Sequence, residues 1–249
     1  MARVMPKKGR WLTFPYFASI IGLSIHRTLR QLPVSVSDDP LLDLSSMDDA
    51  APPARDWSSL PLDALSSIFV RLSAVDVLMG ASLVCRSWLE AANFPDVWRP
   101  VDMDKHESMF LKGDAILREM TKVAVNRSDG QLKVFAGGMF VTDELIKYIM
   151  ERSPSLTTLR LVSCFGVFRK QLASVIKESP LLELRSLELE NIDLTMRELT
   201  TVLESCPILE VLGLHYCFLI NSNDERTLRE NFTRIKTMTL KWDGECYVN

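Results

Sequence analysis

Apolar residues recur at helical spacing over the stretch from residue 57 to residue 98. One face of a first predicted helix collects five of them: Leu62, Leu65, Ile68, Phe69 and Leu72. Leu60-Pro61 precedes this helix, and proline is well tolerated in a first helical turn. Asp76 is a candidate N-cap for a second helix that extends to Trp88. About forty residues cannot enclose this much apolar surface, so we expect part of it to face a partner.

The second half of the chain repeats itself. Three predicted helices carry apolar pairs four residues apart, which share one helix face: Leu145 with Ile149, Leu172 with Ile176, and Leu199 with Leu203. Strand-like triplets accompany them: Leu132-Lys133-Val134, Leu159-Arg160-Leu161, Leu187-Glu188-Leu189, Leu212-Gly213-Leu214 and Met238-Thr239-Leu240. Successive triplets start 27, 28, 25 and 26 residues apart. This period predicts an α/β solenoid with parallel strands inside and helices outside.

Two parts of the chain resemble one protein family. Trp57–Trp98, with its Leu60-Pro61 start and its Leu83–Trp88 cluster, strongly resembles an F-box, the helical module that docks on Skp-family adaptors. The repeats resemble the cysteine-containing leucine-rich repeats of plant-like F-box proteins, which are substrate receptors of SCF-type ubiquitin ligases. The fold expected from the resemblance and the repeats is α/β. A helical F-box over 57–104 precedes a short right-handed solenoid of about five units over 105–249, which begins with a predicted helix over Asp114–Arg127.

The resemblance implies a surface that docks on the adaptor and, through it, joins cullin and RING subunits. In the family, the leucine-proline start, the first helix and the valine-cysteine-arginine-tryptophan cluster meet the adaptor or support that surface. Carried over, the candidates are Leu60, Pro61, Leu62, Leu65, Ile68, Leu83, Val84, Cys85, Arg86 and Trp88. For any one of them, packing inside the module is an equally good interpretation.

The residues between paired apolar positions of the strands are expected on the concave face of the solenoid. They are the candidate target-binding residues: Lys133, Arg160, Glu188, Gly213 and Thr239. Glu190 and His215 are neighbours, His215 at a strand edge or turn. Their mixed charge favours a polar protein surface as the ligand, and an ordinary solvated face is the alternative. The sequence does not identify the target.

Two cysteines follow the strands at a fixed spacing. Cys164 and Cys217 stand eight residues after Leu156 and Leu209, where such repeats place Asn or Cys to meet turn backbone without ladder partners. Ile192 occupies this position in the intervening unit, with Asn191 beside it. We interpret that departure as a locally shifted turn.

Composition and the types of residue present restrict the functions that the sequence can support. The chain is 47% hydrophobic and 24% charged, as expected of a folded protein, and its net charge of −3 does not favour nucleic acid. Five cysteines without a C-x-x-C pair argue for a reducing compartment, against disulfides and against zinc. The three histidines stand apart, and Gly137-Gly138 lacks a phosphate-binding partner. No metal, cofactor or catalytic activity is expected.

Residues 1–56 differ from the rest. Residues 1–37 are basic and lack acidic residues, and an apolar run, Trp11–Ile25, is interrupted by Pro15 and Gly22. This outline fits a secretory signal or a transit peptide, but the run is too short for a membrane span. We favour an unstructured or spurious extension. Residues 38–56 read as an acidic, proline-containing linker.

Two functions remain. The first is the substrate-recognition subunit of an SCF-type ubiquitin ligase, in the nucleus or cytoplasm and without membrane contact. The second is a leucine-rich-repeat scaffold or receptor outside the ubiquitin system, organellar or exported. Adaptor binding by residues 57–98 and retention of residues 1–56 discriminate between them. At the other end, either the tail from Trp242 caps the solenoid or the sequence is a shortened version of a longer protein.

Overall fold

The structure is a computed structural model that describes residues 57–104, 113–164, 172–178, 183–217, 219–220 and 222–241. The chain divides into two units, Met1–Trp57 and Ser58–Asn249, and the elements that follow Trp57 lie in the second. The interpretations of residues 1–37, of residues 38–56 and of the tail from Trp242 concern residues outside the described ranges.

The first described part is a group of short helices. They are η1 (Trp57–Ser59), α2 (Leu62–Phe69), α3 (Ala74–Met79), η2 (Ala81–Leu83), α4 (Arg86–Ala91) and η3 (Pro95–Trp98). Pro61 stands at the N-cap of α2, so the leucine-proline step starts a helix as expected. Two aromatic rings, Phe69 and Trp88, pack with centroids 5.4 Å apart in the buried centre of this group.

The prediction of one continuous helix from Asp76 to Trp88 is wrong. The N-cap is Ser73, whose hydroxyl accepts a hydrogen bond from the Asp76 amide (3.1 Å) and donates one to the Asp76 carboxylate (2.9 Å). The helix ends at Gly80, and Cys85 is extended (φ −157°, ψ 179°). Three short helical segments therefore replace one long helix, and the chain turns between them.

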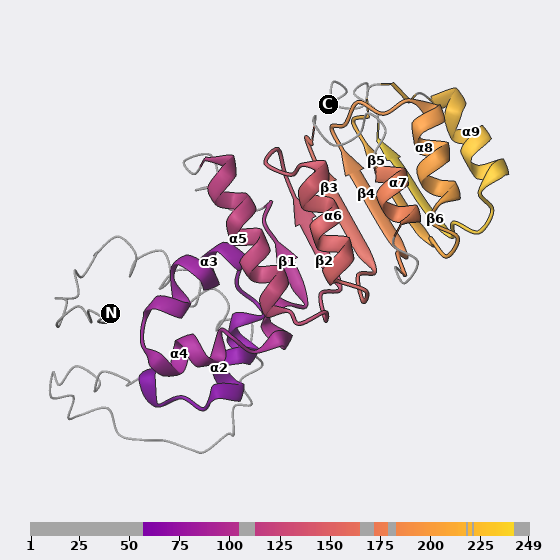
Figure 1. Cartoon of the computed structure of the whole chain (residues 1–249). Coiled ribbons are helices and arrows are strands. Elements are labelled where there is room, and N and C mark those ends of the chain that lie inside the picture. The colour runs from indigo at the N-terminus through magenta and orange to yellow at the C-terminus, as the bar shows by residue number, and fades with distance from the viewer. Residues whose placement is uncertain are drawn as a thin grey trace, which may run out of the picture. The chain divides into compact units, whose positions relative to one another are not determined.

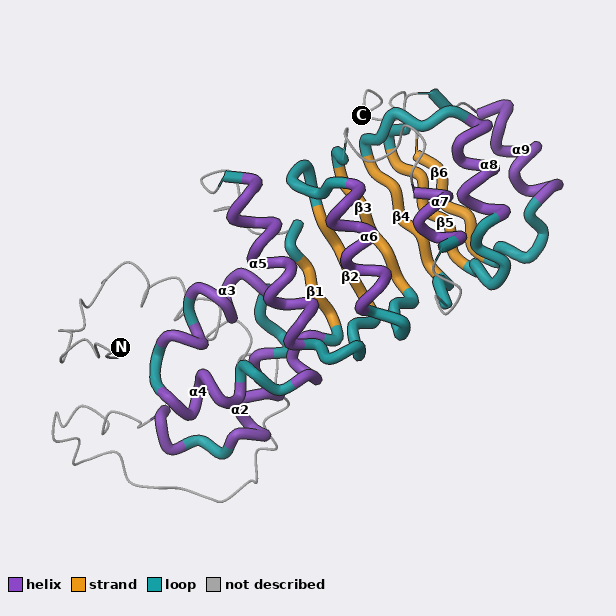
Figure 2. The backbone as a smooth tube through the Cα atoms, viewed as in Figure 1, coloured by secondary structure: helices purple, strands orange, loops and turns teal. Residues whose placement is uncertain are grey.

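A six-stranded parallel sheet follows, with its strands in chain order. The strands are β1 (Pro100–Asp102), β2 (Val134–Gly137), β3 (Thr158–Val162), β4 (Ser186–Glu190), β5 (Val211–His215) and β6 (Thr237–Lys241). The helices are α5 (Asp114–Arg127), α6 (Asp143–Arg152), α7 (Leu172–Lys177), α8 (Met196–Glu204) and α9 (Ser222–Asn231). Figures 1 and 2 show these helices along one face of the sheet. The predicted α/β solenoid architecture is confirmed, and so are the bounds of the Asp114–Arg127 helix.

The repeat register explains the core. All six residues of the predicted helical pairs are buried: Leu145, Ile149, Leu172, Ile176, Leu199 and Leu203. Across the sheet, one row of buried side chains runs through paired strand positions: Val101, Phe135, Leu159, Leu187, Leu212 and Met238. Each repeat thus buries one helix face against one strand face, and the neighbouring repeats cover the remaining sides of this core.

The prediction for the first strand triplet is wrong by three residues. Phe135, not Leu132, pairs with Leu159, and Lys133 lies before β2 rather than in it. Leu132 is fully buried three residues before Phe135. Leu156 and Leu184 occupy the equivalent positions in the next two units and are buried as well. β1 was not predicted. It lies within residues 57–104 and pairs with β2, so the sheet begins directly behind the helical group.

Candidate functional site

The turn between η2 and α4 exposes two large apolar side chains. Leu83 is 61% exposed and Val84 is 52% exposed. The turn behind them is fixed from inside: Ala81 and Ser82 are buried, and the Ser82 hydroxyl donates to the Leu78 carbonyl at 3.1 Å. Buried residues therefore hold this turn in place and leave the Leu83 and Val84 side chains facing solvent. This is the arrangement expected of a docking surface.

The other candidate docking residues divide into three groups. Pro61 and Arg86 are exposed, and a second set is half-buried: Leu60, Leu62, Ile68 and Cys85. Leu65 and Trp88, by contrast, are 0% and 6% exposed. Their burial favours the alternative interpretation, packing inside the module, over direct contact with a partner. They pack inside the helical group and keep the surface residues in place.

Four large apolar side chains of the module that were not predicted as candidates are also exposed, namely Trp57, Val70, Met79 and Leu89. Each stands next to a helix end or next to a buried aromatic residue in the sequence. The apolar spacing predicted one long helix in place of α3, η2 and α4. It therefore could not indicate which side chains become exposed where the chain turns between these segments.

The uncovered face of the sheet carries an ion-pair cluster centred on Arg160 of β3. Its guanidinium lies 3.2 Å from Asp104, 2.9 Å from Glu190 and 3.5 Å from Glu188. The Arg160 side chain is 27% exposed, so the pairs are only partly screened by water. Desolvation lowers the pKa of Arg160, but the three carboxylates outweigh it and leave the pKa raised. The guanidinium is therefore a fixed positive charge within an acidic surrounding.

A small residue on β2 leaves room for this cluster. Arg160 lies on β3 and Asp104 follows β1, the two strands on either side of β2, and Ala136 of β2 pairs with both Arg160 and Asp102 in the register. With Ala136 in this position, the arginine and aspartate side chains meet beside the middle strand.

The remaining candidate target-binding residues are placed unequally. Glu188 is half-buried, Thr239 is exposed, and Gly213 is buried with its Cα beside the Glu188 side chain. Lys133 does not belong to this row, because Ala136 takes its place and Asp102 precedes it. His215, at the end of β5, is half-buried, and its Nε2 is buried with no hydrogen-bond partner among the described residues.

The turns after β3, β4 and β5 are alike. Ser163, Asn191 and Tyr216 have positive φ values of 53°, 51° and 56°, and each donates its backbone N–H to the next strand or its end. The prediction of a shifted turn at Asn191 is therefore wrong. Ile192 is fully buried there, as the two cysteines are in the neighbouring units.

The Cys164 thiol bonds to turn backbone, as the spacing predicts: it donates to the Gly138 carbonyl, which follows β2, at 3.1 Å. The Cys217 thiol instead donates to a strand carbonyl, that of Leu189 in β4, at 3.6 Å. Each contact joins a turn to the preceding repeat. Cys164 and Cys217 are thus structural residues in the repeat turns.

Metal-binding groups and membrane-spanning helices are absent from the described part of the chain. Its histidine, cysteine and acidic residues form no group of three or more that could hold a metal ion. None of its helices is both long and apolar enough to cross a bilayer.

A shallow apolar groove of about 470 Å³ runs between α3 and α5, lined mainly by Leu78, Met79, Ile116 and Val123.

Residues 57–104 match the F-box-like family. Three Arabidopsis thaliana proteins are similar over most of the chain. F-box/LRR-repeat protein 23 is 35% identical over 65% of this chain, F-box protein SKIP19 is 31% identical over 77%, and F-box/LRR-repeat protein 9 is 30% identical over 65%. The matched regions span 35%, 62% and 66% of those proteins' own lengths.

Proposed function

We propose that this chain, which is similar to F-box/leucine-rich-repeat proteins, is the substrate-recognition subunit of an SCF-type ubiquitin ligase. In this role the helical group of residues 57–98 binds a Skp-family adaptor, which connects the chain to cullin and RING subunits. The concave face of the repeats binds a target protein, which is ubiquitinated and degraded. The complex would act in the nucleus or the cytoplasm.

The observation that carries this proposal is the exposed pair Leu83 and Val84 within the region that matches the F-box-like family. Large apolar side chains are this exposed at few places in the module, and here they stand in the segment that the family uses for adaptor contact. Burying them against an adaptor would contribute at most roughly 1.5–3 kcal/mol for each side chain, because each is already partly buried. Pro61 and Arg86 are exposed as well and are the next candidates for contact.

The proposed mechanism is proximity without chemistry by this chain. A target held on the repeats is kept near a ubiquitin-charged enzyme at the other end of the complex, which raises the effective concentration of its lysines. The target contacts would come from the sheet face around Arg160, Glu188 and Thr239, where charged and hydroxyl side chains are accessible. A polar protein surface suits this face better than an apolar segment does.

The proposal is tested by co-purification of the full chain with a Skp-family adaptor. The double variant Leu83→Asp/Val84→Asp replaces two exposed side chains, so the fold should persist while adaptor recovery falls at least tenfold. A matched control, Met139→Asp/Leu219→Asp, changes two apolar residues of the repeats that are 59% and 54% exposed. The control should bind the adaptor as the parent does.

Undiminished adaptor recovery by the folded Leu83→Asp/Val84→Asp variant would refute the proposed surface. Absence of adaptor binding by the parent chain would favour the alternative, a leucine-rich-repeat scaffold or receptor outside the ubiquitin system. Pro61→Ala combined with Leu62→Asp is a second test at the start of α2. It should also abolish co-purification while the repeats remain folded.

A further inference from the structure

Helix α5 exposes two large apolar side chains on one face. Ile116 is 55% exposed and Val123 is 41% exposed, and they stand seven residues apart, which is about two helical turns. Among the described residues of α5 to α9, no other large apolar side chain is exposed. A surface helix normally carries polar residues on the face away from the core, so this face of α5 differs from the usual pattern.

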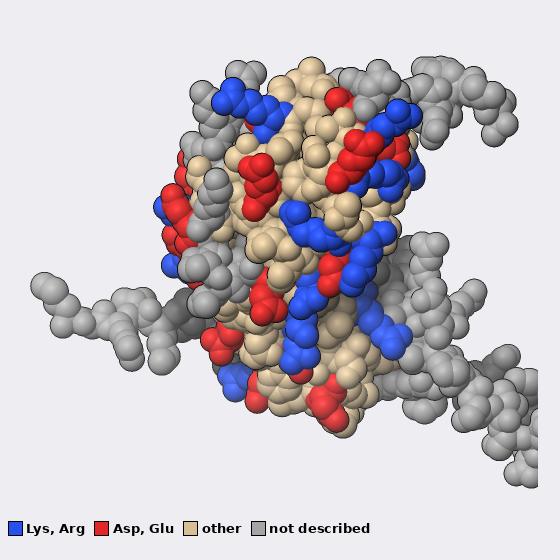
Figure 3. All heavy atoms as spheres, turned by 90° about the vertical axis from the view of Figure 1, so that its right-hand side faces the viewer, with Lys and Arg blue, Asp and Glu red and all other residues tan. Residues whose placement is uncertain are grey.

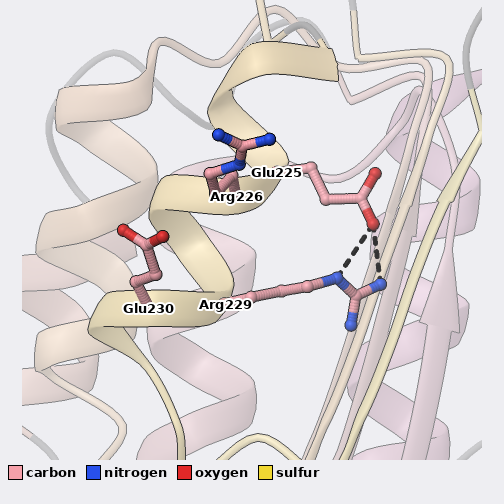
Figure 4. A pocket seen from close by; sticks show the side chains of 4 residues that line it. All are labelled: Glu225, Arg226, Arg229 and Glu230. Carbon is pink, nitrogen blue, oxygen red and sulfur yellow. Dashed lines mark hydrogen bonds and ion pairs between the residues drawn. The ribbon is translucent and has the colours of Figure 1, made fainter.

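The later helices of the repeats follow the usual pattern. The exposed residues of α6 are all charged: Glu144, Lys147, Glu151 and Arg152. On α9, Glu225 binds the Arg229 guanidinium at 2.9 Å from Nε and 2.7 Å from Nη2, while Arg226 and Glu230 point elsewhere (Figure 4). Figure 3 shows basic and acidic side chains spread over the side of the molecule that presents α9. The apolar face is therefore particular to the first repeat helix.

This face of α5 forms one wall of the apolar groove, and the end of α3 forms the other. Leu78 and Met79 line the groove from α3, and Met79 is 37% exposed. Met120 of α5 also lines it and is buried. Among the described residues of the lining, Glu119 is the one that carries a charge, and the Lys122 ammonium binds its carboxylate at 2.7 Å. The groove thus offers apolar surface beside a charge that is already paired.

The groove adjoins the turn that exposes Leu83 and Val84. The Ser82 hydroxyl of this turn donates to the carbonyl of Leu78 in the groove wall. Met79 and Leu83 are four residues apart in the sequence, so their Cα atoms are separated by at most about 14 Å. A protein interface of ordinary size covers about 800 Å² on each partner, a patch roughly 28 Å across. The turn and the groove therefore lie within the area that one partner covers.

We propose that the groove between α3 and α5 is a second contact site for the Skp-family adaptor, which fills it with apolar side chains. This inference rests on the function proposed above and extends the adaptor contact from the helical group to the first repeat helix. Since α3 belongs to the helical group and α5 to the repeats, an adaptor seated on both would hold the repeats in one orientation relative to itself. A bound target would then keep a fixed place in the ligase.

The size of the groove favours the adaptor over a second copy of this chain. The partly exposed side chains of Met79, Ile116 and Val123 supply far less than the roughly 800 Å² that each partner contributes to a stable interface. The groove therefore suits an addition to a larger contact, such as the one at Leu83 and Val84. A symmetric pair of copies would also place two identical hollows opposite each other, which leaves space that tightly packed interfaces do not contain.

The test measures the affinity of the full chain for a purified Skp-family adaptor by isothermal titration calorimetry. Ile116→Gln/Val123→Gln makes the groove wall polar, adds no charge and keeps a good helix former at both positions. The adaptor should bind this variant about tenfold more weakly than the parent. The matched control Met139→Gln/Leu219→Gln changes two exposed apolar side chains elsewhere in the repeats and should bind as the parent does.

Two further measurements apply if the double variant does not fold. Met79→Gln changes the opposite wall of the groove and should also weaken adaptor binding. In the parent chain, a saturating adaptor should slow amide exchange over residues 114–124, which belong to α5. Unchanged exchange over these residues, in a complex that protects the helical group, would contradict the proposed contact.

The outcomes separate this inference from the proposed function. Parent-like affinity of the folded Ile116→Gln/Val123→Gln variant, with weakened binding by Leu83→Asp/Val84→Asp, would overturn the inference alone. No adaptor binding by the parent would overturn both. Parent-like affinity with a lower melting temperature would assign the groove to residues 105–112 of the chain itself. Self-association of the parent that the double variant abolishes would assign it to a second copy, and either result would overturn the proposal.

Discussion

Thiol burial sets the acidity of the cysteines inside the repeats. Burial raises the pKa of Cys164 to about 12 and that of Cys206 to about 11, from an ordinary value near 9. Desolvation of the thiolate is the main cause in both cases, because neither side chain is more than 2% exposed. The folded protein therefore holds these protons at pH values where an unfolded chain releases them.

This difference predicts a loss of stability in alkaline solution. Above pH 9 the unfolded state releases thiol protons that the folded state keeps, so the free energy of unfolding falls as pH rises toward 12. Each such thiol contributes a slope of up to about 1.4 kcal/mol per pH unit. Urea unfolding of the parent and of Cys164→Ala between pH 8 and pH 10.5 should give a flatter profile for the variant. Parallel profiles would contradict the assigned burial effect.

At the residue scale, the sequence predicted where Cys164 and Cys217 lie in the repeat. It did not predict which of the candidate docking residues are exposed and which are buried. The eight-residue spacing places Cys164 and Cys217 correctly because the repeat imposes it. Leu65 and Trp88 could not be separated from Leu83 by the same means, since family resemblance does not distinguish a contact residue from one that supports it. Only the chain turn at Gly80 and Cys85 determines which side chains leave the core.

Gly137 shows how an element departs from its repeat. It pairs with Leu161 in the register but has no side chain, and its space is filled by the Phe135 ring and by Val141. A Cβ at this position would lie 2.6 Å from the Val141 side chain and 2.9 Å from the Phe135 ring. The large aromatic ring of Phe135 therefore requires the glycine two residues later.

Gly137→Ala should destabilise the protein by about 1–3 kcal/mol, as overpacking of a core does. Gly138→Ala is the matched control, because its Cβ would meet only ordinary contacts at 3.4 Å and 3.7 Å. Thermal unfolding of both variants measures the difference, and the control should stay close to the parent. Equal melting temperatures for the two variants would contradict the proposed packing of β2.

The same glycine explains the misplaced strand. In the later units, a buried leucine precedes the apolar-x-apolar triplet by three residues, as Leu156 precedes Leu159. In the first unit the last triplet position is Gly137, so Leu132-Lys133-Val134 resembles the triplet better than the true strand does. Strands β3 to β6 were predicted because their triplets are complete. β1 is three residues long and begins with proline, which gave no periodic signal.

At the scale of the described molecule, the helical group continues directly into the sheet. Trp98 is 1% exposed, its indole N–H donates to the Ala92 carbonyl at 2.9 Å, and β1 starts two residues later. The guanidinium of Arg127, at the end of α5, lies over the Trp98 ring at 5.5 Å. A cation over a buried indole adds roughly 0.5–2 kcal/mol. The turn that exposes Leu83 and Val84 and the uncovered face of the sheet are thus connected through packed elements.

The central claim is that one end of this unit binds the adaptor while the sheet face remains available to a target. Hydrogen exchange of the full chain with and without a Skp-family adaptor tests it directly. The claim predicts slower exchange in the peptides that cover α2, η2 and α4, with unchanged exchange in those that cover β3, β4 and β5. Protection confined to the strands, or no protection of the helical group by a saturating adaptor, would contradict it.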